Sequence, residues 1–212
     1  MNYQKKLFEW TEGRKLKSVK AIIMHWDASR GIPDLEFLWK WMDKRGHAMK
    51  ADGDTAPCYH FLVSHSRVIE TIEAPNRAIH CGHRTYRKKA KEFFGERVCS
   101  KLDSPNNYTI GVCGLHDVEG TGGYDADTME TLIELAAKLC QKYNLNPETD
   151  LLRHSDLTNE KETPCPKAFF EDDNDPDDLW RSFKGWVAHE MKGEYGNIGM
   201  IKGLSRKERY LK

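Results

Sequence analysis

The chain lacks the features that carry a protein into a membrane or hold it on nucleic acid. Its 33 basic and 33 acidic side chains cancel, so no overall field attracts nucleic acid or acidic lipid. The first ten residues hold no apolar segment typical of a signal peptide, and no apolar run reaches the roughly 20 residues of a membrane span. We therefore expect a cytoplasmic protein with no nucleic-acid partner and no membrane insertion.

Two common metal and redox motifs are also missing. No Cys-x-x-Cys pair occurs, which excludes zinc-ribbon and thioredoxin-like sites. His189-Glu190 lacks the second histidine of the His-Glu-x-x-His helix found in many zinc proteases. The six cysteines accompany no signal peptide, and the chain is too long for a disulfide-stapled miniature scaffold. We expect them to be thiols.

What the chain does contain is apolar and aromatic material for one substantial core within 212 residues. Predicted strands cover residues 19–25, 59–63, 67–72 and 108–113, and the second and third form a hairpin with its turn at 64–66. Predicted helices begin at Asp34, near Ala90, after a cap at Asp127, and near Leu179. Strands alternating with helices predict an α/β fold, a central mixed β-sheet flanked by α-helices.

Two histidines and a cysteine in three separate motifs indicate a metal site. His25 ends the first predicted strand, whereas His154 and Cys165 lie far along the chain, so only a folded structure could assemble them. Three protein ligands are typical of a catalytic zinc, which keeps its fourth position for water. Spacing alone leaves chance open, because nine histidines and six cysteines form many triples.

Five motifs, in order, give the chain a family resemblance from about Val19 to Phe170. They are the strand that ends at His25; YHFLV at 59–63 with the following Val68-Ile69; AIHCG at 78–82; NYTIGV at 107–112; and His154 followed by TPCP at 163–166. The chain thus resembles the zinc-dependent N-acetylmuramoyl-L-alanine amidases of type 2, which include phage lysins and share their fold with peptidoglycan recognition proteins.

The resemblance implies a reaction and a cofactor. The reaction is hydrolysis of the amide between the lactyl group of N-acetylmuramic acid and L-alanine, in peptidoglycan or a muropeptide. The cofactor is Zn²⁺, with His25, His154 and Cys165 as ligands. Zinc polarises the amide carbonyl and lowers the pKa of water.

The resemblance also assigns roles to three further residues. Tyr59 matches a tyrosine near the metal, where its phenol would bind the attacking water or the oxyanion; the alternative is a strand tyrosine with a buried ring. Thr163 matches a residue that steadies the oxyanion, with Lys161 as the less well-spaced substitute. His80 matches a histidine that lines the substrate groove, and a purely structural histidine is the alternative.

One departure from the family concerns the general base. Many relatives have a glutamate directly after Ile-Gly-Val, where this chain has Cys113. A thiol on a core strand is a poor base at neutral pH. Tyr59 is one substitute, and Glu119 is a weaker candidate. We expect His60 and His116 not to bind the metal, His60 because it should alternate with Tyr59 along one strand.

The resemblance divides the chain into an N-terminal extension at 1–18, a zinc amidase domain at 19–172, and a C-terminal helix with a basic tail at 173–212. In this last part Trp180 and Trp186 either pack on the core or face sugar rings or a partner subunit. We expect a phage or prophage endolysin, cytoplasmic until host lysis or holin-type release. A non-catalytic peptidoglycan-binding protein and a cytoplasmic muropeptide-recycling amidase are the alternatives, and the sequence does not give the oligomeric state.

Overall fold

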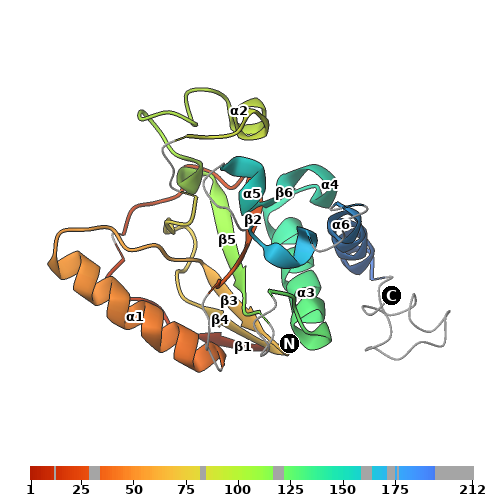
Figure 1. The fold of residues 1–212 in the computed structure, drawn as a ribbon, viewed down its shortest axis with the longest axis horizontal. Helices are drawn as coiled ribbons and strands as arrows, with labels where there is room; N and C mark the ends of the chain where they lie inside the picture. The colour runs from red at the N-terminus through yellow and green to blue at the C-terminus, as the bar shows by residue number, and fades with distance from the viewer. Residues whose placement is uncertain are drawn as a thin grey trace.

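In a computed structural model, the chain folds into a six-stranded mixed sheet with helices on both faces (Figure 1). The structure describes residues 1–11, 13–28, 34–81, 85–116, 122–158, 164–170, 175 and 177–193. In chain order the elements are β1 (Asn2–Lys5), β2 (Ala21–Trp26), α1 (Leu35–Ala51), β3 (Phe61–Ser64), β4 (Arg67–Glu70), α2 (Lys88–Phe94), η1 (Pro105–Asn107), β5 (Thr109–Gly114), α3 (Ala126–Tyr143), α4 (Pro147–Asp150), β6 (Leu151–Arg153), α5 (His154–Leu157), η2 (Lys167–Phe170) and α6 (Asp178–Met191).

The strand order is β1-β4-β3-β5-β2-β6, and only the β3–β4 pair is antiparallel among the described strands. The predicted hairpin is confirmed, and its turn places His65 at a φ of 48°. The α/β prediction is confirmed as well. Because β5, β2 and β6 run parallel, their carboxyl ends meet at one edge of the sheet, where side chains from distant segments come together.

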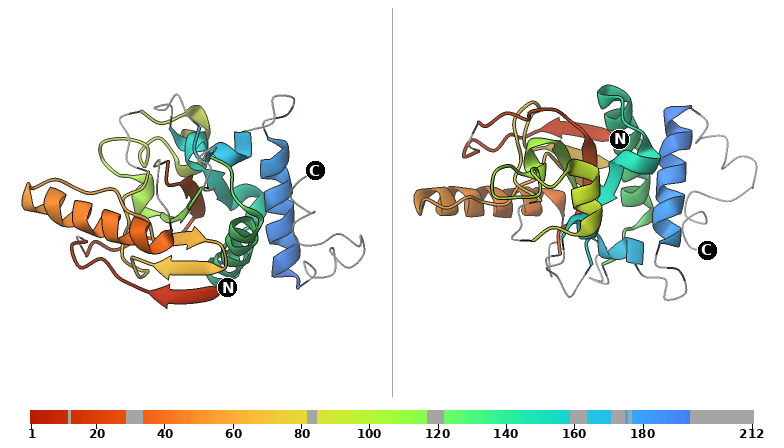
Figure 2. Two further views of the ribbon diagram at one scale, coloured as in Figure 1. Left: turned by 60° about the horizontal axis from the view of Figure 1, so that its bottom comes forward. Right: turned by 90° about the horizontal axis from the view of Figure 1, so that it is seen from above.

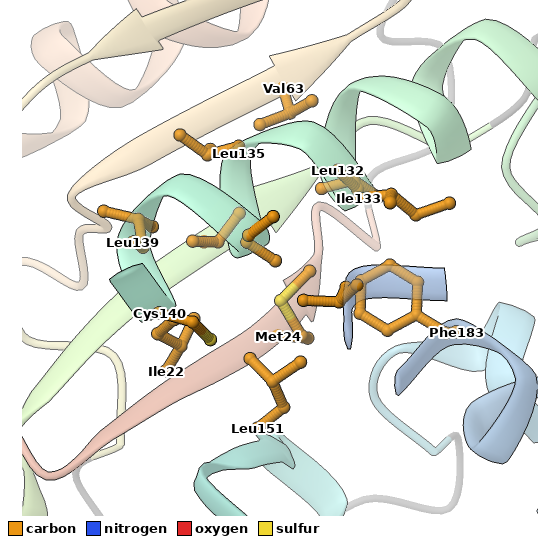
Figure 3. Close-up of a cluster of buried hydrophobic side chains, with 14 of the residues drawn as sticks. Ile22, Met24, Val63, Leu132, Ile133, Leu135, Leu139, Cys140, Leu151 and Phe183 are labelled. Carbon is orange, nitrogen blue, oxygen red and sulfur yellow. The ribbon is translucent and has the colours of Figure 1, made fainter. Parts of the chain in front are cut away.

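One face of the sheet packs on α3 and α6. The alternation of β2 sends Ile22 and Met24 to this side, where they meet Leu132 of α3 and Phe183 of α6 (Figure 3). All four side chains are fully buried. Burying one such side chain is worth about 1.5–3 kcal/mol, so this layer supplies much of the driving force for folding.

The opposite face is covered by α1 over one half and by α2 with α5 over the other (Figure 2). Leu35, Leu38 and Met42 of α1 are buried, as the helical spacing predicts, but Trp41 is 41% exposed. Gly46 lies under the indole of Trp10, where a Cβ would come within 1.9 Å of the ring. That helix glycine therefore makes room for an aromatic side chain from the N-terminal segment.

The long helix α3 begins two residues earlier than expected. Its N-cap is Asp125, whose carboxylate accepts a hydrogen bond from the Thr128 backbone N–H at 2.7 Å. The prediction of Asp127 as the cap is therefore wrong. Asp127 lies instead in the first turn, where its charge favours the positive end of the helix dipole.

The two ends of the chain contribute to this same sheet and core. β1 pairs in parallel with β4, and Phe8 and Trp10 are buried, so part of the segment expected as an extension at 1–18 belongs to the sheet. Trp180 is 4% exposed and stacks on Phe183, which favours packing on the core over sugar contact. The basic tail from residue 194 lies outside the described residues. None of the helices described is long and apolar enough to span a membrane.

Candidate metal centre

His25, His154 and Cys165 come together at the carboxyl edge of the sheet. β2 and β6 run side by side, with Met24 paired to Arg153. The next residue along the chain is His25 in β2 and His154, the first residue of α5, after β6. The His25 and His154 rings lie 4.6 Å apart, and His25 Nδ1 lies 3.9 Å from Cys165 Sγ. One ligand atom from each of the three residues lies within 4.8 Å of the other two.

Ser155 joins two of these segments. Its backbone N–H donates to the Cys165 carbonyl at 2.9 Å, and its hydroxyl accepts from the Cys165 N–H at 2.5 Å. This pair of hydrogen bonds holds Cys165 beside His154, the residue that precedes Ser155. Sequence reasoning missed Ser155, although the side chain that follows a predicted ligand is a natural candidate for such a contact.

Arg153 connects the centre to the C-terminal helix. It is 5% exposed and bonds Asp156 at 3.2 Å and Asp177 at 2.7 Å. Its guanidinium also lies 4.2 Å from the Phe170 ring centroid. A buried arginine needs such partners, because an unpaired buried charge is costly. The network places the end of β6, and with it the start of α5 at His154, against the core.

The donor set suits zinc. Two imidazoles and one thiol are borderline and soft donors, and they leave one position of a tetrahedron open. His25 and Cys165 are buried, and His154 is partly exposed, which leaves the centre reachable from one side. By the chemistry of its ligands, the triad fits a catalytic rather than a fully enclosed structural metal.

A depression of about 220 Å³ opens at the triad. Its lining consists of Arg87, His154, Ser155, Thr158, Pro164, Cys165 and Phe170. Arg87 is exposed and is the one cationic side chain of that lining among the described residues. The depression therefore offers a route to the two ligands at its base, with a positive charge at its wall.

Tyr59 lies beside the triad, with its ring centroid 4.9 Å from that of His25. Burial raises the pKa of its phenol well above the usual value, and the neighbouring Cys113 raises it further. At neutral pH the hydroxyl therefore keeps its proton and acts as a hydrogen-bond donor. This state fits the predicted role at the oxyanion and disfavours Tyr59 as a base.

His80 is 6% exposed and touches a ligand of the triad. Its Nδ1 lies 3.0 Å from His25 Nε2, and its Nε2 lies 3.2 Å from the Thr109 hydroxyl. Burial lowers the pKa of His80 well below its usual value, so the ring is neutral. Its assignment to the substrate groove stays a prediction, and its burial favours the structural alternative.

Cys113 pairs in register with His25 on the neighbouring strand, so both side chains point to the same face. The thiol is 0% exposed. A buried thiol has little tendency to ionise, since burial disfavours the thiolate. Cys113 thus lies next to the metal ligand as the resemblance implies, without the properties of a general base.

The two histidines expected not to bind metal are absent from the metal clusters of the described residues. His60 precedes β3, so strand alternation does not govern it as expected; its ring instead contacts the Asn76 carbonyl and the Gly111 N–H, each at 3.0 Å. His116 Nδ1 lies 2.6 Å from an Asp27 carboxylate oxygen. Thr163, Lys161 and Glu119 lie outside the described residues, so their predicted roles stay predictions.

A family model described as N-acetylmuramoyl-L-alanine amidase matches residues 15–168. That match covers most of the chain and includes all three members of the triad. The chain belongs to the N-acetylmuramoyl-L-alanine amidase family.

Curated amidases are similar to this chain in sequence. The amidase BlyA of Bacillus subtilis (strain 168) is 25% identical over 184 residues, which are 86% of this chain and 44% of BlyA. Two Bacillus licheniformis amidases match over 40% and 39% of their length, so this chain spans less than half of the curated relatives that it matches.

Solved structures show the same fold. The catalytic domain of PlyG superposes with a TM-score of 0.63 at 17% identity, covering 90% of this chain and 96% of that domain. The endolysin amidase LysCS from Clostridium intestinale gives a TM-score of 0.58 at 16% identity, covering 88% of this chain and 95% of LysCS. The amidase family and the mixed-sheet fold are thus established together, while the metal and the residues of catalysis rest on the geometry above.

Proposed function

We propose that this chain is a zinc-dependent N-acetylmuramoyl-L-alanine amidase that cleaves the amide between the lactyl group of N-acetylmuramic acid and L-alanine. The observation that carries the proposal is the convergence of His25, His154 and Cys165 within 4.8 Å, with His154 and Cys165 lining an open depression. Membership of the amidase family supports the same reaction.

The residues around the triad divide the work of amide hydrolysis. When bound, zinc supplies Lewis acidity, which polarises a carbonyl and favours the ionisation of water. The Tyr59 phenol, protonated and beside His25, donates a hydrogen bond to the oxygen that becomes negative at the transition state. Thr163, two residues before Cys165 in the sequence, is proposed as a second donor to that oxygen because it matches the family residue that steadies the oxyanion. Cys113 is given no part in proton transfer, because its thiol is buried where many relatives have a glutamate.

Arg87 gives the depression a preference for anionic substrates. Its guanidinium lies at the wall of the depression that holds His154 and Cys165. Peptide stems of the bacterial wall carry free carboxylates, and a guanidinium binds a carboxylate through two parallel hydrogen bonds. Arg87 therefore holds the stem peptide, while the triad acts on the amide that joins the stem to the sugar.

We further propose that the enzyme acts on intact wall as an endolysin. LysCS, an endolysin whose fold this chain shares, supports this role. The non-catalytic alternative is disfavoured, since a binding module does not need the Cys165 thiol. A recycling amidase for soluble muropeptides is the second candidate function, because the same triad would act on the same amide in a soluble fragment.

The deciding experiment follows the release of new L-alanine amino termini from purified peptidoglycan. The zinc-loaded protein should release them, and the chelated protein and Cys165→Ala should not. Cys99→Ala is the matched control, because Cys99 is also a buried thiol but lies in a different cluster from the triad. No release from the zinc-loaded protein on several wall types would overturn the amidase proposal.

A second measurement separates the two catalytic roles. Loss of turbidity of intact walls is compared with cleavage of a soluble anhydro-muropeptide at equal enzyme concentration. Preference for intact walls supports the endolysin, and cleavage of the soluble substrate alone supports recycling.

A further inference from the structure

His80 stands behind the metal triad rather than in the depression. It is missing from the lining of the depression, and only 6% of it is exposed. Its Nδ1 meets His25 Nε2 at 3.0 Å, while the other nitrogen of His25, Nδ1, faces Cys165 Sγ at 3.9 Å. The His25 ring thus lies between His80 on one side and the proposed metal position on the other.

The hydrogen-bond partners of His80 determine where the protons lie. The Thr109 hydroxyl donates to the Pro105 carbonyl at 2.9 Å, so it accepts from His80 Nε2 at 3.2 Å. His80 Nε2 therefore carries the proton and His80 Nδ1 is an acceptor, since a neutral imidazole has one of each. His80 Nδ1 has two neighbours, Cys81 Sγ at 2.9 Å and His25 Nε2 at 3.0 Å. Two ring nitrogens that face each other at this distance need a proton between them, so His25 donates its Nε2–H to His80, which leaves His25 Nδ1 deprotonated and able to bind a metal.

The sequence around His80 builds a seat for this ring. The Asn106 side-chain oxygen accepts from the backbone N–H of His80 at 3.0 Å and from that of Cys81 at 2.8 Å. The ring itself lies on Gly111, where a Cβ would come within 2.6 Å of His80 Cγ. The AIHCG motif thus supplies the His80 ring. The NYTIGV motif, with Asn106 directly before it, supplies the backbone and side-chain contacts that hold the ring in place.

We propose that His80 is the positioning residue of the metal centre, which orients His25 and selects its tautomer through the chain Pro105, Thr109, His80, His25. This inference rests on the zinc site of the proposed function. Metal-binding histidines commonly donate their second N–H to such an acceptor, and loss of the acceptor costs about 10–100-fold in metal affinity.

The same atoms allow a rival arrangement. His25 Nε2, His80 Nδ1 and Cys81 Sγ also lie within 4.8 Å of one another and could hold a metal themselves. In that case the His80 nitrogen would bind a metal rather than accept the His25 proton. Zinc binding by Cys81→Ala distinguishes the two arrangements: the positioning role predicts one zinc per chain, which Cys81→Ala keeps, whereas a metal held by His25, His80 and Cys81 would be lost from that variant.

The first test measures zinc affinity by competition with a chelator. His80→Leu should weaken binding about 10–100-fold, because leucine fills the space without an acceptor. His80→Asn should recover much of the affinity, since its side-chain oxygen reaches the place of Nδ1. His116→Leu is the matched control: His116 is a similarly buried histidine in neither metal cluster, and its Nδ1 contacts Asp27, so the folded variant should bind zinc like the parent.

The second test reads the tautomer directly and needs no substitution at His80. Nitrogen-15 NMR of the chelated protein should show His25 protonated at Nε2 and His80 protonated at Nε2. Thr109→Val, which removes only the hydroxyl, should broaden or mix the His80 tautomers and weaken zinc binding by less than His80→Leu does. Thr109→Ser should behave like the parent protein.

The outcomes separate the inference from the proposed function. A parent protein that binds no zinc overturns both. A parent that binds one zinc through His25, with unchanged affinity in His80→Leu, overturns only the positioning role. A His25 ring protonated at Nδ1, or loss of zinc from Cys81→Ala, overturns it as well.

Discussion

The face of the sheet that packs on α3 and α6 buries mostly hydrocarbon, whereas the face that carries His25 buries imidazoles and thiols beside its apolar side chains. On the first face Ile22, Met24 and Phe183 meet other apolar side chains (Figure 3). On the second face His25, His60 and His80 are all buried, and the His80 ring lies 5.1 Å from that of His25 and 5.9 Å from that of His60. One strand, β2, supplies both faces through its alternation.

The difference shows how one sheet separates stability from chemistry. A hydrocarbon layer gains free energy from burial without needing specific partners. A layer of buried polar groups gains little, and each group must find a hydrogen bond, as His60 does with the Asn76 carbonyl. Substitutions on the first face should therefore change folding, and substitutions of the proposed metal ligands and of Tyr59 on the second face should change binding and catalysis.

The largest expected effect comes from removing His25. His25→Ala should abolish zinc binding at micromolar metal and lower amidase activity by at least about 10³-fold, since a Lewis acid contributes several kcal/mol to transition-state stabilisation. The melting temperature of the chelated variant should stay near that of the chelated parent. Activity within tenfold of the parent would contradict the placing of the centre on this face.

Removing a large side chain from the face that packs on α3 and α6 should lower the stability of the fold and leave zinc affinity unchanged. Phe183→Ala removes a ring that is 0% exposed and stacked between α6 and the core, and should lower the free energy of unfolding by about 3–5 kcal/mol. Denaturant titration measures the loss. Zinc affinity of the folded fraction should be unchanged, and a parallel loss of affinity would show that the two faces are coupled.

The histidine-rich face should also make stability depend on pH. Burial lowers the pKa of His60 from 6.5 to about 4, so between these values the unfolded chain binds a proton that the folded chain does not. Stability should therefore be complete above pH 6.5 and fall as the pH drops toward 4, by at most about 3 kcal/mol. Denaturant titrations of chelated protein at pH 7 and pH 4.5 measure the fall.

His60→Gln tests the origin of that fall. The variant should lose stability at pH 7 and show a shallower dependence below it, with a remainder from the other buried histidine, His80. An unchanged slope would assign the acid sensitivity to other groups.

The smallest expected effect concerns Tyr59. Tyr59→Phe keeps the ring beside His25 and removes only the hydroxyl, so kcat should fall about 10–100-fold while zinc affinity stays the same. Steady-state kinetics on a soluble muropeptide separate kcat from KM. A change confined to KM would place the phenol in substrate binding instead.

Much of the fold could be predicted because its patterns are local. The alternation of β2, the hairpin around His65 and the apolar stripe of α3 each follow from a few neighbouring residues. The boundary of α3 was missed by two residues because Asp125 and Asp127 are equally good caps in sequence. The contribution of residues 2–5 as an edge strand was missed too, since their exposure leaves no apolar alternation to read.

The sequence by itself determined the order of β2, β3, β4 and β5 and of the main helices, because these rest on residue type and short spacing, and its family resemblance implied the three proposed metal ligands. Only the tertiary structure decided how the histidines divide their roles. His25, His60 and His80 all lie in apolar surroundings and look alike in sequence, yet their partners differ: Cys165, the Asn76 carbonyl and His25 itself. Those partners come from segments far apart in the chain, and only the pairing of the strands brings them within hydrogen-bonding distance.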